Sequence, residues 1–111
     1  MSTATEPALD VDSLNARLLR AGVPQRAREV VLRAPSVGRN LASVNGLSPE
    51  TGDLLARSAT VAVLRLLASR TSRYSAAARL ASSCSDATAR QLDAWVVVLE
   101  READAIESGA A

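Results

Sequence analysis

Histidine, lysine and phenylalanine are absent from this chain of 111 residues, which contains only one cysteine and two aromatic residues. Without histidine the chain cannot form a Ser-His-Asp triad, and Cys84 alone cannot form an internal disulfide or a cysteine-based zinc site. The five glycines are scattered, so no glycine-rich phosphate-binding loop is present. Acidic pairs such as Glu100 and Asp104 fit a solvated helix face better than acid–base catalysis. The sequence therefore predicts a protein that is not an enzyme and that binds no cofactor or metal.

Long hydrophobic runs are also missing, because arginine or aspartate interrupts every apolar stretch. A membrane span needs about 20 consecutive, mostly apolar residues, so we expect no membrane insertion. The first twelve residues are acidic and lack the basic start and apolar centre of a signal peptide, which favours a cytoplasmic location. All 13 basic residues are arginines, and alanine and leucine are abundant. This composition is typical of a bacterial genome rich in G and C.

Charge is unevenly distributed along the chain. Residues 13–90 carry twelve arginines and four acidic residues, whereas residues 1–12 and 91–111 both carry a net negative charge. Opposite charges attract over distances of about 8 Å at physiological ionic strength. Three explanations remain open at this stage: an anionic partner, an acidic tail folded over a basic body, and head-to-tail self-association.

Helix start and stop signals recur at short intervals, and no segment shows the alternation of a half-buried strand. We expect residues 1–9 to be a disordered acidic lead-in, 10–107 to be a single helical domain, and 108–111 to be a disordered tail. The segment that starts at Thr60 is predicted to be the most buried, and the final helix to be the longest. The predicted helices are Asp12 to Gly22, Pro24 to Pro35, Ser36 to Asn45-Gly46, and those opened by Ser48-Pro49-Glu50, Thr60, Ser72 and Asp86, the last ending near Ile106.

A short ending, one leucine followed by small or charged residues, recurs along these segments. Alternate endings such as Leu41, Leu67 and Leu92 stand about 25 residues apart, which corresponds to two short helices per unit. One such pair cannot bury its apolar face alone, but stacked pairs can. The predicted fold is therefore all-α: short antiparallel helix pairs stacked as a small solenoid and closed by a longer C-terminal amphipathic helix.

The segment 34–82 resembles the leucine-rich repeat variant family. The first unit matches at Val37, Leu41, Ala42, Ser43, Leu47, Pro49, Glu50, Leu55 and Ala56. The second unit matches at Val63, Leu67, Ala68, Ser69, Leu80 and Ala81, but Arg73 and Ser75 replace the turn leucine and the proline. The resemblance implies stacked pairs of short helices that form a binding surface. Some members of that family bind an iron–sulfur cluster, which a single cysteine cannot ligate.

Arginines concentrate on the predicted central helices. We expect a face formed by Arg57, Arg65, Arg70, Arg73 and Arg79 to bind an acidic protein surface. Two alternatives stay open: these arginines serve solubility alone, or they contact a nucleic-acid backbone while Tyr74 stacks on a base. Residues 39–55 also resemble a helix-turn-helix, although Gly52 occupies a position where that motif has a branched apolar residue, and Glu50 and Asp53 would face phosphates.

The final predicted helix carries more apolar residues than one stripe requires. Leu92, Trp95 and Leu99 share one side of the helix, while Val97 and Val98 point elsewhere. Either the helix is buried deeply enough to cover both valines, or it forms a self-association or partner surface with Trp95 as an anchor. The overall hypothesis is a helical-repeat adaptor that binds a protein, with a small helix-turn-helix DNA-binding protein as the alternative.

Overall fold

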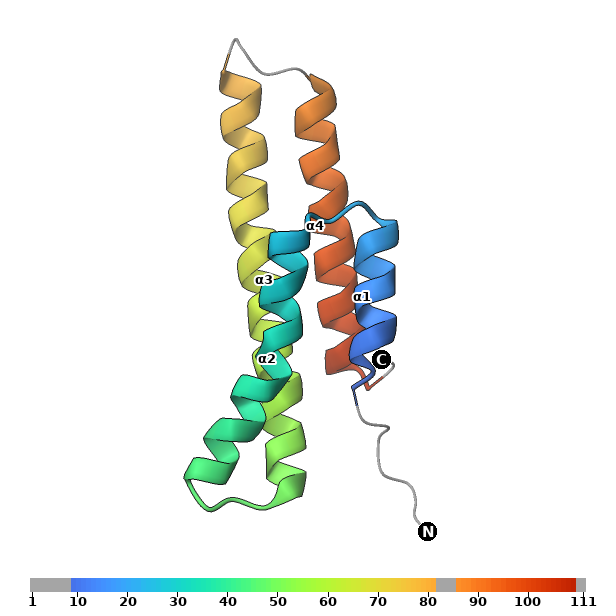
Figure 1. The fold of residues 1–111 in the computed structure, drawn as a ribbon. Coiled ribbons are helices and arrows are strands. Elements are labelled where there is room, and N and C mark those ends of the chain that lie inside the picture. The colour runs from blue at the N-terminus through green and yellow to red at the C-terminus, as the bar shows by residue number, and fades with distance from the viewer. Residues whose placement is uncertain (1–8, 82–85, 110–111) are drawn as a thin grey trace.

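The computed structural model describes residues 9–81 and 86–109, and these residues form four helices and no strand. They are α1 (Val11–Arg20), α2 (Gln25–Val44), α3 (Pro49–Leu80) and α4 (Asp86–Glu107). Successive helices run antiparallel and form an elongated bundle (Figure 1). The all-helical prediction is thus confirmed. The predicted solenoid is not confirmed, because the region assigned to several short helix pairs forms one bundle of longer helices.

Three predicted helix breaks are wrong, at Pro35, Thr60 and Ser72, and the first lies in α2. Proline in a helix interior removes one backbone hydrogen bond and costs about 3 kcal/mol. Here α2 continues through Pro35, whose side chain is fully buried, and the helix changes direction near its middle (Figure 1). Burial of Val31, Ala34 and Ala42 on both sides of the proline holds the two halves against the bundle.

The second wrong break lies at Thr60, which was expected to start a helix. Instead, α3 runs for 32 residues through both Thr60 and Ser72, and it is α3 rather than α4 that is longest. The Thr60 hydroxyl is buried and donates a hydrogen bond of 2.7 Å to the carbonyl oxygen of Ala56, four residues earlier. A threonine satisfied in this way fits a helix interior. Leu64 and Ala68 of this segment are almost fully covered, but Leu66 is 54% exposed, so the expectation that this segment is the most buried one is not confirmed.

The true helix ends follow the capping residues closely. Asp10, rather than the expected Asp12, caps α1, and its Oδ1 accepts from the amide N–H of Ser13 at 3.0 Å. Gly22 and Gly46 adopt positive φ angles of 81° and 69° where the chain turns after α1 and α2, as predicted for glycine at a helix end. The Ser48 hydroxyl caps α3 by accepting from the amide of Thr51 at 3.2 Å.

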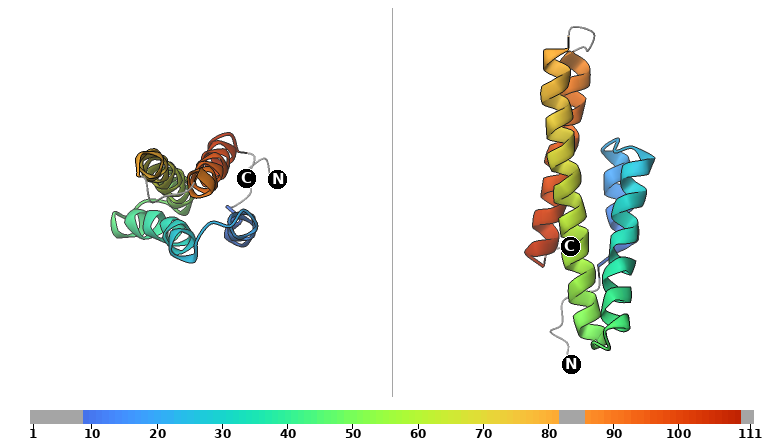
Figure 2. Two further views of the ribbon diagram at one scale, coloured as in Figure 1. Left: turned by 90° about the horizontal axis from the view of Figure 1, so that it is seen from above. Right: turned by 90° about the vertical axis from the view of Figure 1, so that its left-hand side faces the viewer.

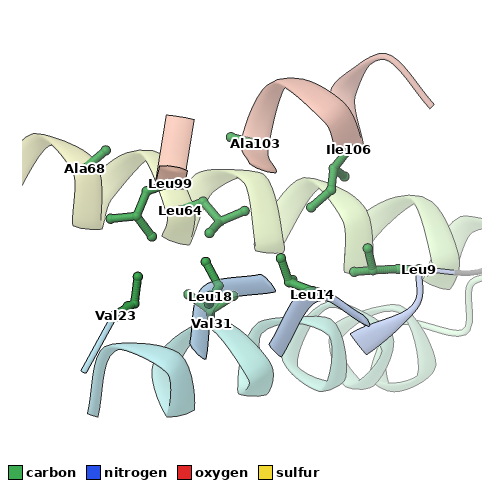
Figure 3. Close-up of a cluster of buried hydrophobic side chains, with 10 residues drawn as sticks. All are labelled: Leu9, Leu14, Leu18, Val23, Val31, Leu64, Ala68, Leu99, Ala103 and Ile106. Carbon is green, nitrogen blue, oxygen red and sulfur yellow. The ribbon is translucent and has the colours of Figure 1, made fainter. Parts of the chain in front are cut away.

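A small core joins all four helices in the middle of the bundle (Figure 3). Leu9, assigned from the sequence to the lead-in, is buried in this core. The predictions for residues 1–8, for Cys84 and for residues 110–111 lie outside the described part of the chain. The core consists of Leu9, Leu14, Leu18, Val23, Val31, Leu64, Ala68, Leu99, Ala103 and Ile106.

Two helix pairs extend from this core at opposite ends of the molecule, which measures 56 × 27 × 20 Å (Figure 2). We call residues 36–57 the α2–α3 arm; it contains the second half of α2, the turn and the start of α3. We call residues 69–81 and 86–95 the α3–α4 arm. Each arm consists of only two helices. The helix faces that contact a third helix in the core therefore have no such neighbour in the arms.

Candidate protein-binding surface

The arginines predicted to form one binding face do not share one side of α3. Arg65 points to α4 and bonds to Glu100 at 2.8 Å, to Asp104 at 2.9 Å and also to Glu107. Arg79 likewise pairs with Asp93 of α4. Arg70, five residues after Arg65, lies about 140° around the helix from it. Arg65 and Arg79 are therefore engaged in holding α4 against α3.

These ion pairs also change the acid–base behaviour of the groups involved. The hydrogen bonds that Arg65 donates to Asp104 and Glu107 raise the pKa of its guanidinium group. Hydrogen bonds from Arg79 and Ser75 lower the pKa of the Asp93 carboxyl group. On α1, Arg17 donates to the largely buried carboxylate of Glu102 at 2.8 Å, which raises the pKa of Arg17. Among the three explanations for the segregated charge, the structure shows the acidic C-terminal segment folded over the basic body.

The remaining predicted site residues lie at separate places. Arg57 lines a hollow of about 480 Å³ below the end of α4, together with Leu54 and Ile106. Arg70 and Arg73 are exposed and form no ion pair within the described residues. Trp95 is half-buried against the turn after α1, where its Nε1 lies near Gly22.

The two valines of α4 differ in their surroundings. Val98 is half-buried and packs against the core, as the burial explanation requires. Val97 is exposed, at 53% of its surface. The excess apolar face expected on α4 is thus reduced to one valine, which is a common situation on a protein surface.

Residues 39–55 form an antiparallel hairpin. The α2 and α3 backbones run side by side, and a Cβ atom built on Gly38 would lie 2.5 Å from the carbonyl carbon of Leu55. The helices of a DNA-binding helix-turn-helix cross at about 90–120° instead. In Figure 1 the two helices of this hairpin lie closer to antiparallel than to such a crossing.

An uncovered apolar surface lies on α2 and α3, around a groove between the two helices. The exposed fractions of its larger α2 side chains range from 47% at Val30 to 83% at Val44, whereas Ala59 and Val63 of α3 are half-buried. Five of its side chains are large hydrophobic residues that are about half exposed or more. We call this surface the α2–α3 stripe; it consists of Val30, Val37, Leu41 and Val44 of α2 and Ala59, Val63 and Leu66 of α3.

A groove of about 280 Å³ runs between the two helices within this stripe. Val30 and Val37 form one wall, Val63 lies on the other side, and Ala34 and Ala59 line the space between the two helices. Arg33 is the one charged residue that lines the groove. Because the small alanines leave room between larger side chains, this surface can accept a protruding apolar side chain.

Sequence reasoning missed this surface for a specific reason. The predicted helix break at Pro35 placed Val30 and Val37 on different helices, so their spacing of seven residues carried no meaning. In the continuous α2, residues seven apart share a face, and Val30, Val37 and Val44 form one row. Val37 and Leu41, which fit the repeat pattern as core residues, are exposed.

The remaining features of the described residues point to no other kind of site. Within residues 9–81 and 86–109, no cluster of acidic residues or cysteine is arranged to hold a metal ion. No helix in those ranges combines the length and the hydropathy that a bilayer span requires. The chain matches no protein-family model, and comparisons with curated proteins and with solved structures found no similar protein.

Proposed function

We propose that this protein is a non-catalytic protein-binding module that binds its partner through the α2–α3 stripe. The observation that carries the proposal is the row of exposed apolar side chains on one side of a helix pair, next to a groove lined by alanines. Contiguous apolar surface of this kind in contact with water commonly marks an interaction site. The arginine face anticipated from the sequence supports this role less well, because Arg65 and Arg79 are paired with α4.

Site-specific photocrosslinking in cells of the source organism tests the proposal. A photoreactive amino acid at position 37 should capture a protein, whereas the same group at position 97 should not. Val37 and Val97 are matched controls because both are exposed valines in helices, at 61% and 53%, on different sides of the bundle. No protein captured at position 37, or equal capture at both positions, would contradict the proposal.

The captured protein is then purified and its affinity measured by calorimetry. Burying an apolar side chain contributes about 1.5–3 kcal/mol, so Val37→Ser combined with Leu41→Ser should weaken binding by at least about tenfold. Val97→Ser should leave the affinity unchanged. Equal losses for both variants, or loss of the complex on nuclease treatment, would show that the stripe is not the protein-binding surface.

A further inference from the structure

The α2–α3 stripe has the spacing with which helices recognise other helices. Val30, Val37 and Val44 follow one another at seven-residue intervals, and Leu41 lies four residues after Val37. Rows with this period align with the axis of a neighbouring helix. From Val30 to Val44 the row is about 21 Å long, which corresponds to about four turns of a partner helix.

The groove beside this row suits a helix better than an extended strand. Its walls and floor are side chains of α2 and α3, and neither helix offers the open backbone edge of a β-strand. A strand would gain no backbone pairing on such a surface, whereas an amphipathic helix can insert side chains spaced three or four residues apart between the two ridges.

Arginines are the charged residues that line or border the stripe most directly, and Glu29 lies one helical turn from Arg26 and Arg33. Arg33 lines the groove, Arg26 precedes it by seven residues, and Arg70 follows Val63 by seven residues, so all three border the stripe. None of these three arginines forms an ion pair within the described residues. A surface that combines apolar side chains with unpaired guanidinium groups is complementary to apolar residues flanked by carboxylates.

The acidic residues of α2 and α3 do not balance this positive charge. Glu29 lies about 100° around the helix from Val30 and accepts a hydrogen bond from Gln25. Asp53 bonds to Arg39 at 3.4 Å and lines a different hollow beside the turn. Glu50 lies in the first turn of α3, near the far end of the stripe. A molecule that covers the stripe can therefore supply the counter-charges.

A second copy of the chain fits this surface poorly. In a twofold dimer formed by the stripe, both copies would present the same positively charged surface to each other. The chain's own acidic helix α4 is already paired with Arg17, Arg65 and Arg79. Like charges brought together across an interface are unfavourable, so the charge pattern favours a different, acidic protein.

We infer that the α2–α3 stripe binds an acidic amphipathic helix of a partner protein, about four turns long, with its apolar side chains in the groove and its carboxylates at Arg26, Arg33 and Arg70. This inference rests on the proposed function and adds the chemistry of the partner. The apolar contacts determine where the partner helix lies, and the arginines favour helices that carry acidic residues.

The test is a selection from a displayed library of helical peptides of about 18 residues, with leucines fixed at alternating three- and four-residue intervals and all flanking positions random. The full chain is the bait, and the Val37→Ser/Leu41→Ser variant removes peptides that bind elsewhere. We expect aspartate and glutamate to be enriched about threefold or more at the flanks. A selected peptide should bind about tenfold more weakly to the Arg33→Glu/Arg70→Glu variant than to the unchanged chain. The same peptide with lysines in place of its acidic residues should instead bind this variant more tightly than it binds the unchanged chain.

Different outcomes separate this inference from the proposed function. Peptides that depend on Val37 and Leu41 but show no acidic preference, or a basic one, would overturn the inference and leave the stripe as a binding surface. If no stripe-dependent peptide is enriched, the helical partner is wrong, and photocrosslinking at position 37 decides the proposed function separately. A dimer that Val37→Ser/Leu41→Ser dissociates, or stripe-dependent binding to anionic vesicles in place of peptides, would also overturn the inference.

Discussion

The two arms are both antiparallel helix pairs, yet they are held together in different ways. In the α2–α3 arm the contact between the helices consists of small residues, with Gly38 and Ala42 of α2 close to Gly52 and Leu55 of α3. In the α3–α4 arm a polar network joins the helices, in which the Ser75 hydroxyl donates to Asp93 and Arg79 bonds to both. One contact depends on the close approach of two backbones, and the other on paired charges.

This difference explains where the apolar surface lies. Glycine and alanine allow close packing but bury little apolar area, so the larger side chains of the α2–α3 arm remain outside the contact. Val37, Leu41, Val44 and Leu54 are all more than half exposed. In the α3–α4 arm the charged and hydroxyl groups form hydrogen bonds with one another. The α2–α3 arm is thus the part of the molecule that gains most from a partner.

Among substitutions within the two arms, the largest effect on stability is expected at Gly38. A Cβ atom at this position would lie 2.5 Å from the Leu55 carbonyl group, so Gly38→Ala must push the two helices apart. Alanine normally stabilises a helix by about 1 kcal/mol relative to glycine, but overpacking against a rigid backbone costs about 1–3 kcal/mol and should prevail. The free energy of unfolding, measured by urea denaturation, should therefore fall.

Gly52 is the matched control on the other side of the same contact. Its added Cβ atom would meet Ala42 Cβ at 3.6 Å, an ordinary contact distance. Gly52→Ala should therefore be neutral or stabilise by up to about 1 kcal/mol. If both alanine variants had the same stability, the close approach of the backbones would not be what holds this arm.

The next largest effect is expected in the polar contact of the α3–α4 arm. Ser75 is buried, and its hydroxyl bonds to the Ala89 carbonyl at 3.2 Å as well as to Asp93 and Arg79. Ser75→Ala should lower the free energy of unfolding by about 1 kcal/mol, the usual net value of a lost hydrogen bond. Ser72→Ala, at an exposed position three residues earlier, should instead stabilise α3 slightly. A loss at Ser72 equal to that at Ser75 would argue against the network.

Low pH should destabilise the α3–α4 arm more than the α2–α3 arm. Hydrogen bonds from Arg79 and Ser75 lower the pKa of Asp93 in the folded protein, so its stabilising contribution is complete above the ordinary carboxyl pKa, near 4. This contribution is lost as the pH falls through the lowered pKa of the folded state. Amide protection factors near Ala78 should therefore fall between pH 5 and pH 2.5, and those near Ala42 should change less.

Asp93→Asn provides the control for this pH dependence. The variant lacks the titrating carboxyl group, so protection near Ala78 should lose part of its dependence on pH. Asp10, whose pKa is lowered by the Ser13 amide, lies on α1 outside both arms and should titrate equally in both proteins. An unchanged pH profile would mean that Asp93 does not contribute to this arm.

Several helix ends could be predicted from the sequence because local chemistry determines them. Gly22, the Asn45-Gly46 turn, the Ser48-Pro49 start and the extent of α4 all follow from capping and positive φ angles. The interiors of α2 and α3 could not be predicted in this way. Pro35 and Thr60 are local signals for a helix break, and they are overridden by burial and by a hydrogen bond to Ala56 that exist only in the folded bundle.

The α2–α3 stripe was likewise only partly predictable from the sequence. The seven-residue spacing of Val30, Val37 and Val44 is present in the sequence, but such a row normally indicates a helix face turned to the core. Only the packed structure shows that the small residues Gly38 and Ala42 occupy the contact with α3 and that the valines are left outside. Likewise, Arg65 pairs with residues of α4 that lie 35 to 42 positions later in the sequence, a separation that local patterns do not reveal.

The smallest effect on stability is expected for Val37→Ser/Leu41→Ser, the variant that should weaken partner binding most. Val37 and Leu41 are more than half exposed in the free protein, so Val37→Ser/Leu41→Ser should change the free energy of unfolding by less than about 0.5 kcal/mol per site. A matched substitution in the core, Leu64→Ala, removes a fully buried side chain and should cost about 2–5 kcal/mol. Urea denaturation of both variants measures the contrast. A large loss for the surface variant would mean that these side chains hold the α2–α3 arm together and are not kept exposed for a partner.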